Sequence, residues 1–413
     1  MVKIGLLGLG TIGRGIVEII NERREYLKAA TGVDLRIKMA LVRDINKKRD
    51  VDLSDIILTD NFEDILGDEE IDILVEVTGD LESAYDYITR GLKAGKHIVT
   101  ANKAVVSKYF EEISQLAAEK DLAFLYEASV GGGIPVLKPL REQLALNRID
   151  QVQGILNGTC NYILTRMVNE NKEYDEVLKI AQRLGYAEAD PTADVKGHDT
   201  LRKLRILASL ALQGKIQEED IILYGISNIS KLDVENIKKM DSTIKLIAEA
   251  KRVYNGFTAI VQPTIVKNNN YFANVNMAFN SISFTGNFVG ELKFYGAGAG
   301  KDPTANAVLS DCLDIALNSY RKGNPLGKES LVNLNSELMG RYYLRISKAS
   351  RDILERLEDM TKELLTDEQV IKNKKEGFDL AIITKLVKLS SLNDLIANLG
   401  LEKDQYFLAK IME

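Results

Sequence analysis

The chain has 413 residues, of which 45% are hydrophobic and 28% charged, and its formal net charge is −6. This composition is ordinary for a soluble globular protein, and the length predicts two or three domains. The acidic balance and the lack of a dense basic run exclude a general nucleic-acid binder. Two cysteines without a CxxC motif exclude a zinc site and a disulfide framework. Because the sequence has neither a signal peptide nor an apolar run of membrane-spanning length, we expect a cytoplasmic protein.

The first residues have the pattern of a dinucleotide-binding loop. The apolar stretch Val2–Leu7, which predicts a strand, runs into GLGTIGRG, and an apolar periodicity typical of a helix follows. The glycines with the GxGxxG spacing are Gly8, Gly10 and Gly13. The first permits a tight turn, the second lets the backbone approach a pyrophosphate, and the third lets helix and strand pack closely. Backbone amides at the helix start, those of Thr11 and Ile12 among them, then face the anion.

The next predicted strand, Leu35–Asp44, ends in residues that bear on the choice of cofactor. Arg43, with Lys47 and Lys48 just beyond it, favours a 2′-phosphate and hence NADP. Asp44 is an acid of the kind that binds the ribose hydroxyls of NAD, so NAD stays open. The sequence therefore predicts an NAD(P)-binding domain without deciding between the two cofactors.

Two further predicted strands end at the edge of the sheet where a cofactor lies. One ends at Thr78, and the other, His97–Thr100, is followed closely by Lys103. A lysine just past the carboxyl end of a strand in a doubly wound sheet points into the binding crevice, where it binds substrate or cofactor as a point charge. The alternative is an ordinary lysine at a helix start, which the helix dipole disfavours. We expect His97 to be a packed side chain and not a base.

The segment Glu127–Pro135, EASVGGGIP, follows a predicted strand over 122–129. Three consecutive glycines expose backbone carbonyls, and one carboxylate with several carbonyls forms an oxygen-rich cage for a hard cation. A glycine turn that lets the backbone approach the nicotinamide is an equally good interpretation of the same residues.

The most distinctive stretch is Glu188–Lys203, EADPTADVKGHDTLRK. Its first part has no apolar periodicity and predicts a loop rich in acids. Asp199 then opens a predicted helix, and Lys203 lies four residues later, on the same face of the first turn. Such a loop, leading to a lysine, can hold an amine, an alcohol or an aldehyde. The alternative is an N-capping aspartate with an ordinary helix ion pair.

The rest of the chain mixes helices and strands. Upstream of the acidic loop, Asn157 is predicted to cap a helix and Cys160 to be a small packed residue. Alternating apolar and polar residues predict antiparallel strands over 257–266, 271–286 and 291–300. In the C-terminal region the predicted strands are 342–350, 379–386 and 406–412, and the predicted helices are 351–365 and 391–401.

Taken together, six motifs resemble those of the homoserine dehydrogenase family, in the family's order and over about residues 1–330. They are GLGTIG at the start, TANKA at 100–104, EASVGGGIP at 127–135, NGTCNYIL at 157–164, GYAEADPTADVKGHDTLRK at 185–203 and GAGAGKDPTA at 296–305. The resemblance implies reversible NAD(P)-dependent oxidation of L-homoserine to L-aspartate 4-semialdehyde, a step that leads to threonine, methionine and isoleucine. It also implies a homodimer or homotetramer.

The resemblance assigns roles to individual positions. It implies that Lys203 is the proton donor, that Lys103 contributes to catalysis and contacts the cofactor, and that Glu188 and Asp199 hold the substrate. The positions that match further cofactor contacts are Gly185 and Gly300. The positions whose oxygens match a sodium site are Glu127, Val130, Gly132 and Ile134.

The expected fold class is α/β with three parts. These are a Rossmann domain over 1–135 with a return segment at 300–325, an α+β substrate-binding and dimerisation domain over 136–299, and a small ACT-like domain with βαβ-type order over 340–413. The Pro-Gly turn that follows the first strand of ACT domains is replaced here by Lys348–Arg351. The sequence therefore leaves open whether this domain binds threonine or another amino-acid effector, or only supports a dimer.

Two other functions fit parts of the sequence. One is a non-enzymatic sensor of NAD(P)H that uses the C-terminal domain as a relay, and the other is a related amino-acid dehydrogenase with a different substrate. A sensor needs neither the acidic loop nor Lys103, so the sequence favours an enzyme.

Overall fold

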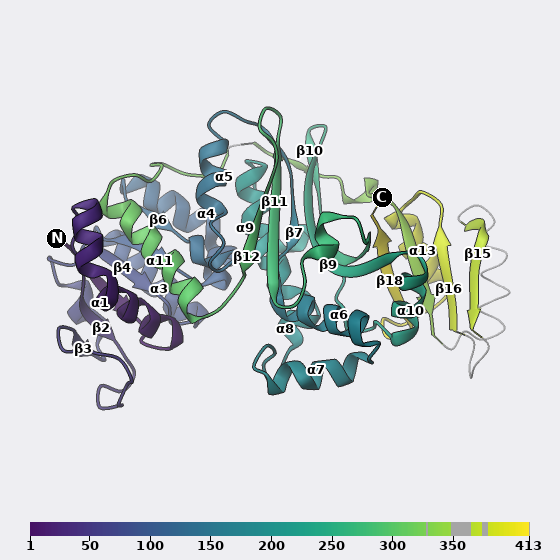
Figure 1. The fold of residues 1–413 in the computed structure, drawn as a ribbon. Helices are drawn as coiled ribbons and strands as arrows, with labels where there is room; N and C mark the ends of the chain where they lie inside the picture. Colours follow the sequence, from purple (N-terminus) through teal and green to yellow (C-terminus); the bar gives the residue numbers. More distant parts are fainter. Residues whose placement is uncertain (328, 348–364, 374–378, 413) are drawn as a thin grey trace. The chain divides into compact units, whose positions relative to one another are not determined.

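The computed structural model describes residues 1–327, 329–347, 365–373 and 379–412 (Figure 1). Its backbone falls into two compact units, each made of several segments of the chain. The segments of the first unit are Met1–Asp150, Arg205–Ile216 and Ile282–Ser330. The segments of the second unit are Gln151–Leu204, Gln217–Ser281 and Leu331–Glu413.

The first unit contains a six-stranded parallel sheet in the order β3-β2-β1-β4-β5-β6. Its strands are β1 Val2–Leu7, β2 Leu35–Leu41, β3 Ile57–Thr59, β4 Ile73–Glu76, β5 His97–Thr100 and β6 Phe124–Leu125. The helices of this unit are α1 Thr11–Thr31, α2 Phe62–Leu66, α3 Leu81–Lys93, α4 Lys103–Glu119, α5 Leu137–Gln143 and α11 Lys301–Ala316. The strand order reverses between β1 and β4, which is where a doubly wound sheet binds its ligand. The predicted Rossmann fold is confirmed.

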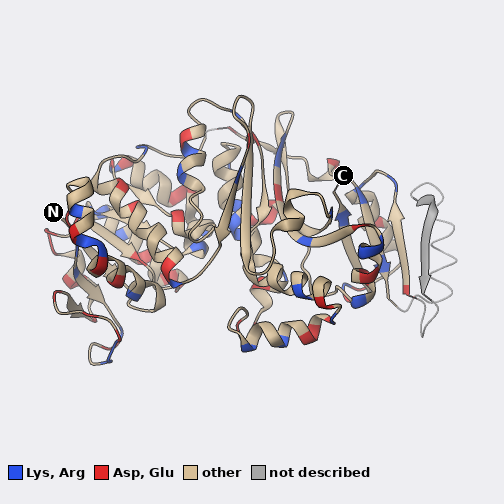
Figure 2. Ribbon diagram, in the orientation of Figure 1, with Lys and Arg blue, Asp and Glu red and all other residues tan. Residues whose placement is uncertain are grey.

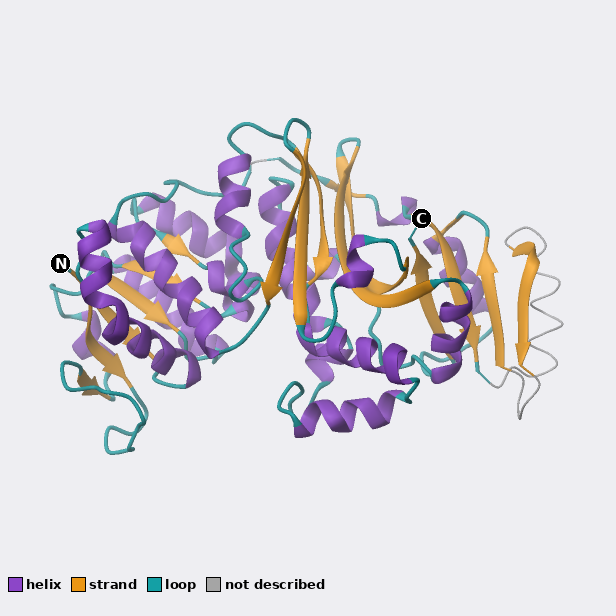
Figure 3. Cartoon of the chain, viewed as in Figure 1, coloured by secondary structure: helices purple, strands orange, loops and turns teal. Residues whose placement is uncertain are grey.

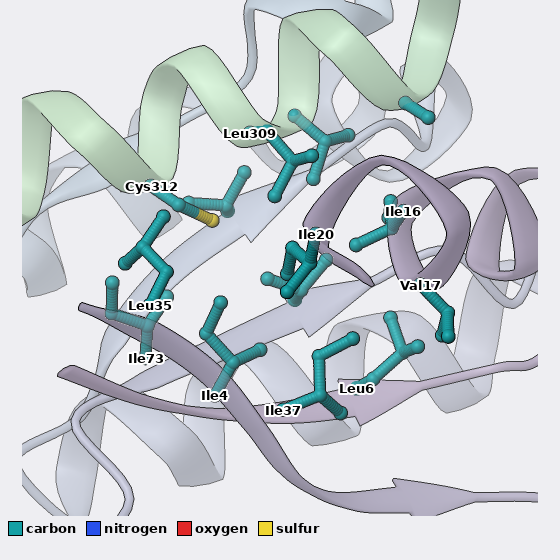
Figure 4. Packing of buried hydrophobic residues seen from close by; sticks show 14 of the residues in the cluster. Ile4, Leu6, Ile16, Val17, Ile20, Leu35, Ile37, Ile73, Leu309 and Cys312 are labelled. Carbon is teal, nitrogen blue, oxygen red and sulfur yellow. The ribbon is translucent and has the colours of Figure 1, made fainter. Parts of the chain in front are cut away.

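Alternate residues of the strands serve the two faces of this sheet, as strand geometry requires. On one face, Ile73 and Val75 of β4 pack with Ile16 and Ile20 of α1 and with Leu309 of α11 (Figure 4). On the other face, a side chain at Gly91 of α3 would meet Leu74 and Ile98. Helices therefore cover both faces (Figure 3), and the return of the chain as α11 completes the core beside α1.

The end of the Rossmann sheet differs from the prediction. The strand expected over 122–129 is limited to β6, and residues Glu127–Ser129 form a 3-10 turn instead. The reason is local: the Glu127 carboxylate accepts hydrogen bonds from the amides of Val136, Leu137 and Lys138 at 2.6–2.8 Å. These bonds cap the start of α5 and bend the chain away from the sheet.

The second unit contains a mixed sheet whose consecutive strands have the order β7-β9-β10-β18-β14-β16-β15. These strands are β7 Ile149–Ile155, β9 Ser242–Val253, β10 Gly256–Lys267, β14 Met339–Ile346, β15 Leu365–Asn373, β16 Asp379–Thr384 and β18 Tyr406–Ile411. Short strands β8 Ile222–Leu223 and β13 Val332–Asn333 pair with β10, and β17 Val387–Lys388 pairs with β14. The helices are α6 Gly158–Glu170, α7 Tyr174–Arg183, α8 Thr192–Val195, α9 His198–Ala211, α10 Lys231–Lys239 and α13 Leu389–Asn398. Helix α9 starts in the second unit and ends in the first.

Several of the strands expected from alternation are shorter or shifted. The segment expected as a strand over 271–286 begins with a 3-10 turn, Tyr271–Asn274, and only β11, Phe279–Gly286, is extended. The next strand, β12, covers Gly290–Ala297. The long strand β9 and the helix α10 were not expected, because buried lysines and acids interrupt their apolar pattern.

The C-terminal strands β14, β15, β16 and β18 are antiparallel to their neighbours within this group. Strand β15 was not expected, and the helix predicted over 351–365 falls mostly outside the described residues. Strand β18 also pairs in parallel with β10, so the tail continues the sheet of the second unit. A buried ion pair joins Arg345 of β14 to Asp233 of α10 at 2.8 Å, and the Tyr343 hydroxyl donates to the same carboxylate. The ACT-like assignment of this tail stays a prediction.

Charged residues of both signs alternate along the helices of both units (Figure 2). None of the helices in the described part of the chain combines the length and apolar character that a bilayer span requires.

Candidate active site

The glycine loop between β1 and α1 has the geometry of a dinucleotide cradle. Gly8 has a φ of +104°, which favours glycine, and a Cβ on Gly13 would lie 2.2 Å from the Gly8 carbonyl oxygen. In contrast, a Cβ on Gly10 would meet nothing within 4 Å. Gly10 is also the N-cap of α1, and the first turn has neither a capping side chain nor an acid. The loop therefore combines a tight turn, open space and free helix-start amides, which is what a pyrophosphate needs.

Further residues expected at the cofactor site follow the ends of β2 and β4. Arg43 is exposed, whereas the Asp44 carboxylate accepts a hydrogen bond from the Asn46 amide at 2.9 Å. Thr78 lies beside the glycine loop, because a Cβ on Gly8 would be 3.3 Å from the Thr78 Cα. The sheet edge thus gathers the first glycine and Thr78 in one place, as their positions at strand ends predicted.

Lys103 is the first residue of α4 and is half-buried. The preceding residue, Asn102, caps this helix by accepting from the amides of Ala104 at 3.1 Å and Val105 at 3.3 Å. Lys103 is therefore a helix-start lysine, and it also follows the carboxyl end of β5. The helix start disfavours a cation, so its presence at this sheet edge is the feature that needs a functional reason.

The triple-glycine loop after β6 packs against a second glycine-rich loop that leads into α11. The Gly133 amide donates to the Ala297 carbonyl at 3.2 Å, and a Cβ on Gly132 would lie 2.5 Å from the Gly298 carbonyl carbon. Gly300 then serves as the N-cap of α11, with a φ of +129°. The sequence had suggested a cation cage that includes the Glu127 carboxylate. In the structure that carboxylate accepts from three amides at the start of α5, and the Glu127 main-chain oxygen accepts from the Val130 amide at 3.3 Å. Among the described residues, no group of three or more His, Cys, Asp or Glu side chains is arranged to hold a metal ion.

The second unit brings Asp199 and Lys203 together. The Lys203 ammonium lies 2.8 Å from Asp199 Oδ2, and it donates to the Leu156 carbonyl oxygen, also at 2.8 Å. Only 4% of Asp199 and 8% of Lys203 is exposed. Helix α9 begins at His198, so Asp199 lies in the first turn and not ahead of it as a cap.

Asn157 adds a third polar side chain to this pair. Its Nδ2 donates to Asp199 Oδ2 at 2.8 Å and to Asp194 Oδ1 at 2.7 Å, and its Oδ1 accepts from the Cys160 amide at 2.7 Å. The predicted cap of α6 is therefore present, and the same residue fixes two acids of the loop. Because the ammonium and the carboxylate are both withdrawn from water, their attraction is stronger than that of a surface pair.

The remaining acids of the loop have local roles. The Asp190 carboxylate accepts from the Thr192 amide at 3.0 Å, and the Thr192 hydroxyl, together with this amide, lowers the pKa of Asp190. Burial raises the pKa of the Cys160 thiol well above its usual range, which fits a packed residue and not a nucleophile.

Glu188 and Gly185 lie on the exposed turn after α7. Tyr186, between them, stacks on Tyr162 with ring centroids 4.5 Å apart, and its carbonyl accepts from the Thr159 hydroxyl at 2.6 Å. The turn is thus anchored on α6, and the Glu188 carboxylate is left at the surface of the second unit.

Several buried charged residues escaped the sequence analysis, Glu76 and Lys245 among them. Glu76, the last residue of β4, is fully buried, and Lys245 of β9 is fully buried as well. The Lys245 ammonium donates to the Val275 carbonyl at 2.6 Å and to the amide oxygens of Asn161 and Asn276. In both cases the signal was a charged residue inside an apolar strand, ILVE and TIKLIA.

Comparison with known proteins finds one family for both parts of the chain. Residues 8–127 match the family described as "Homoserine dehydrogenase, NAD binding domain", and residues 135–313 match the family described as "Homoserine dehydrogenase". A homoserine dehydrogenase of Bacillus subtilis is 38% identical over 97% of this chain and 95% of its own length. One of Synechocystis is 45% identical over 76% of this chain and 73% of its own length. A solved homoserine dehydrogenase structure from Thiobacillus denitrificans has a TM-score of 0.89 and 35% identity, and covers 100% of this chain and 98% of that one.

Proposed function

Because this chain belongs to the homoserine dehydrogenase family, we propose that Lys203 is the proton donor in its NAD(P)-dependent interconversion of L-homoserine and L-aspartate 4-semialdehyde. The observation that carries this role is the buried contact of the Lys203 ammonium with Asp199, which Asn157 reinforces. An ammonium group can donate its proton to a stronger base that develops within hydrogen-bond distance. The alkoxide formed when an aldehyde accepts a hydride is such a base.

The first unit fits the cofactor. The turn at Gly8, the space around Gly10 and the start of α1 suit a pyrophosphate, and a bound dihydronicotinamide supplies the hydride. We infer that NADP is preferred over NAD, because Arg43 is exposed for a 2′-phosphate and the Asp44 carboxylate is engaged in its own turn. The preference is measured as the ratio of kcat/KM for the two cofactors.

In the reductive direction, Lys203 donates its proton to the carbonyl oxygen while that oxygen gains negative charge. Asp199 orients the lysine and shares its charge, and Asn157 keeps the Asp199 carboxylate in place. In the oxidative direction, neutral Lys203 takes the hydroxyl proton. Glu188 is assigned to the α-ammonium group of the substrate, because an exposed carboxylate suits a cation that arrives from solvent. Lys103 is assigned to the cofactor and to the charge that develops during transfer.

A sodium ion belongs to the proposal. Its ligands would be the main-chain oxygens of the loop that begins at Glu127, because hard cations accept carbonyl ligands and the Glu127 side chain is already committed. The ligands assigned are Glu127, Val130, Gly132 and Ile134. Sodium should raise the melting temperature relative to tetramethylammonium at equal ionic strength. Equal melting temperatures with the two cations would contradict a sodium site.

The proposal extends to assembly and compartment. We propose that the protein is a homodimer or homotetramer in the cytoplasm. The candidate binding region for an amino-acid effector such as threonine is the group of C-terminal strands. Light scattering of the purified protein gives the assembly, and threonine titration during the assay gives the effector response.

One assay separates this function from its alternatives. NADPH absorbance is followed with L-aspartate 4-semialdehyde, and then NADP or NAD is supplied with L-homoserine. Turnover in both directions is expected. NADPH binding without turnover in either direction would instead favour a sensor, and turnover of another amino acid alone would favour a related dehydrogenase.

A further inference from the structure

Glu76 is a buried carboxylate at the carboxyl end of β4, beside the point where the strand order reverses. Its Oε1 accepts from the Thr78 amide at 2.7 Å and from the Thr78 hydroxyl at 2.6 Å, and its Oε2 accepts from the Thr100 hydroxyl at 2.6 Å. Burial raises the pKa of Glu76, and the donors from Thr100, Thr78 and Gly79 oppose that rise. Several donors converging on one buried carboxylate form a rigid junction between two strand ends.

One arm of this junction leads to Lys103. The Thr100 hydroxyl, which donates to Glu76, accepts from the Asn102 amide at 3.0 Å. Asn102 in turn caps α4, whose first residue is Lys103, and its Nδ2 donates to the Asp80 carbonyl at 3.3 Å. The position of the Lys103 backbone is therefore set through Thr100 and Asn102 by the Glu76 carboxylate.

The other arm leads to the dinucleotide loop. Thr78 is held through both its amide and its hydroxyl, and the preceding carbonyl, that of Val77, would lie 3.1 Å from a Cβ on Gly8. A shift of the Thr78 turn would thus press on the first glycine turn or open a gap beside it. Both arms end at the sheet edge where the proposed cofactor lies.

We propose that Glu76 is a positioning residue, whose carboxylate locks the ends of β4 and β5 so that Lys103 and the Thr78 turn hold the geometry that the cofactor and the reaction require. This inference rests on the proposed function only for the reaction, since cofactor affinity reports on the junction without turnover. A carboxylate that served stability alone would change the melting temperature but neither cofactor affinity nor kcat.

The chain offers a matched control at the other end of strands β4 and β5, where their amino ends lie. Lys96 is 5% exposed and donates to the carbonyls of Asp68 at 2.7 Å and Ile71 at 2.9 Å. Lys96→Met removes a buried charged junction of similar extent that has no route to Lys103. It should lower the melting temperature and leave the NADPH dissociation constant and kcat within twofold of wild type.

Glu76→Gln keeps the shape of the side chain but removes its charge, so the bonds from Thr78 are no longer charge-assisted and the Thr100 hydroxyl must turn to accept from the new amide group. We expect NADPH affinity, measured by fluorescence titration, to fall about 5- to 20-fold, and kcat to fall about 10-fold or more. Thr100→Val should lower kcat in the same way. Thr100→Ser, which keeps the hydroxyl, should have a kcat close to that of the wild type. If Glu76→Gln does not fold, the comparison of Thr100→Val with Thr100→Ser tests whether the junction affects kcat.

The double variant Glu76→Gln/Lys103→Ala tests the route through Lys103. If the carboxylate acts through this lysine, Glu76→Gln should lower kcat less than about twofold further in the Lys103→Ala background. Wild-type NADPH affinity and kcat in Glu76→Gln, or losses that multiply in full in the double variant, would overturn the inference. A wild-type enzyme that binds NADPH but turns over no homoserine would instead contradict the proposed function, and the affinity measurements would still test Glu76.

Discussion

The two units build their candidate functional groups from different material. In the first unit the dinucleotide cradle is mainly backbone: a glycine turn, a close approach of Gly13 to Gly8, and the uncapped start of α1. In the second unit the reacting group is a buried network of side chains, in which Lys203, Asp199 and Asn157 hold one another. The first solution has no room for a Cβ at Gly13 and keeps open space at Gly10, whereas the second tolerates no loss of a polar partner.

This difference has a practical consequence for substitutions. A change in the cradle should act on cofactor affinity, because the backbone itself contacts the ligand. A change in the side-chain network should act on kcat, because the network positions the proton that moves. The following predictions test that division, from the largest expected effect to the smallest.

Among the four substitutions that test this division, Asp199→Asn should have the largest effect. The amide keeps the shape of the side chain but removes the charge that pairs with Lys203, and it presents a donor to the lysine or to Asn157. We expect kcat to fall about 10²- to 10³-fold, with NADPH affinity unchanged, as measured by steady-state kinetics and fluorescence titration. A loss of NADPH affinity with unchanged kcat would contradict this division of roles between the two units.

Lys245→Met tests whether a buried cation elsewhere in the second unit serves only the fold. Burial lowers the pKa of Lys245 from 10.5 to about 8, so between these values the unfolded chain binds more protons than the folded chain. The contribution of Lys245 to the free energy of unfolding should therefore rise between pH 8 and pH 10.5 by up to about 3 kcal/mol, and be lost again as the pH falls. Urea unfolding of wild type and variant across this range measures the difference. A difference that does not change with pH would contradict the burial argument.

Gly10→Ala tests whether the open space at Gly10 serves the ligand and not the stability of the fold. Because a Cβ at Gly10 meets no protein atom within 4 Å, the melting temperature should stay within about 2 °C of wild type. The methyl group would occupy the volume where the pyrophosphate approaches, so NADPH affinity should fall about 10- to 100-fold. Gly13→Ala is the matched variant, since its Cβ would clash with the Gly8 carbonyl and should lower both affinity and melting temperature. Equal behaviour of the two variants would show that the loop is not a cradle.

Glu188→Gln should have the smallest effect. Its carboxylate is exposed, so its removal costs little stability, and its assigned role is to attract the substrate ammonium group. We expect KM for homoserine to rise about 10-fold with kcat within about threefold of wild type. A fall in kcat at constant KM would contradict this role and indicate that Glu188 takes part in proton transfer.

The same contrast explains how much the sequence could predict. The cradle was predicted residue by residue, because its strand, glycines and helix are consecutive and each glycine has a local reason. The ion pair of Asp199 and Lys203 was also local, four residues apart on one helix. The bond between Asn157 and Asp199 joins residues 42 apart, and only the folded second unit brings them together.

The largest errors in the predicted fold have a common cause. Glu127 was assigned to a strand, whereas it lies in a 3-10 turn and its carboxylate caps the start of α5. Strand β9 and the buried residues Glu76 and Lys245 were missed, because charged residues in apolar strands interrupt the pattern on which prediction depends. Their partners lie on other strands, helices and loops, so no local pattern reveals that these charges are compensated.

The most direct test of the account is the kinetics of purified Lys203→Ala with NADPH and L-aspartate 4-semialdehyde. The Lys203 ammonium is the only group to which the account assigns the proton, and it lies in the network with Asp199 and Leu156. We predict that kcat falls at least about 10³-fold while the NADPH dissociation constant changes little, and that the melting temperature falls because the buried Asp199 carboxylate loses its partner. Wild-type kcat in the purified variant would contradict the assignment of Lys203 as the proton donor.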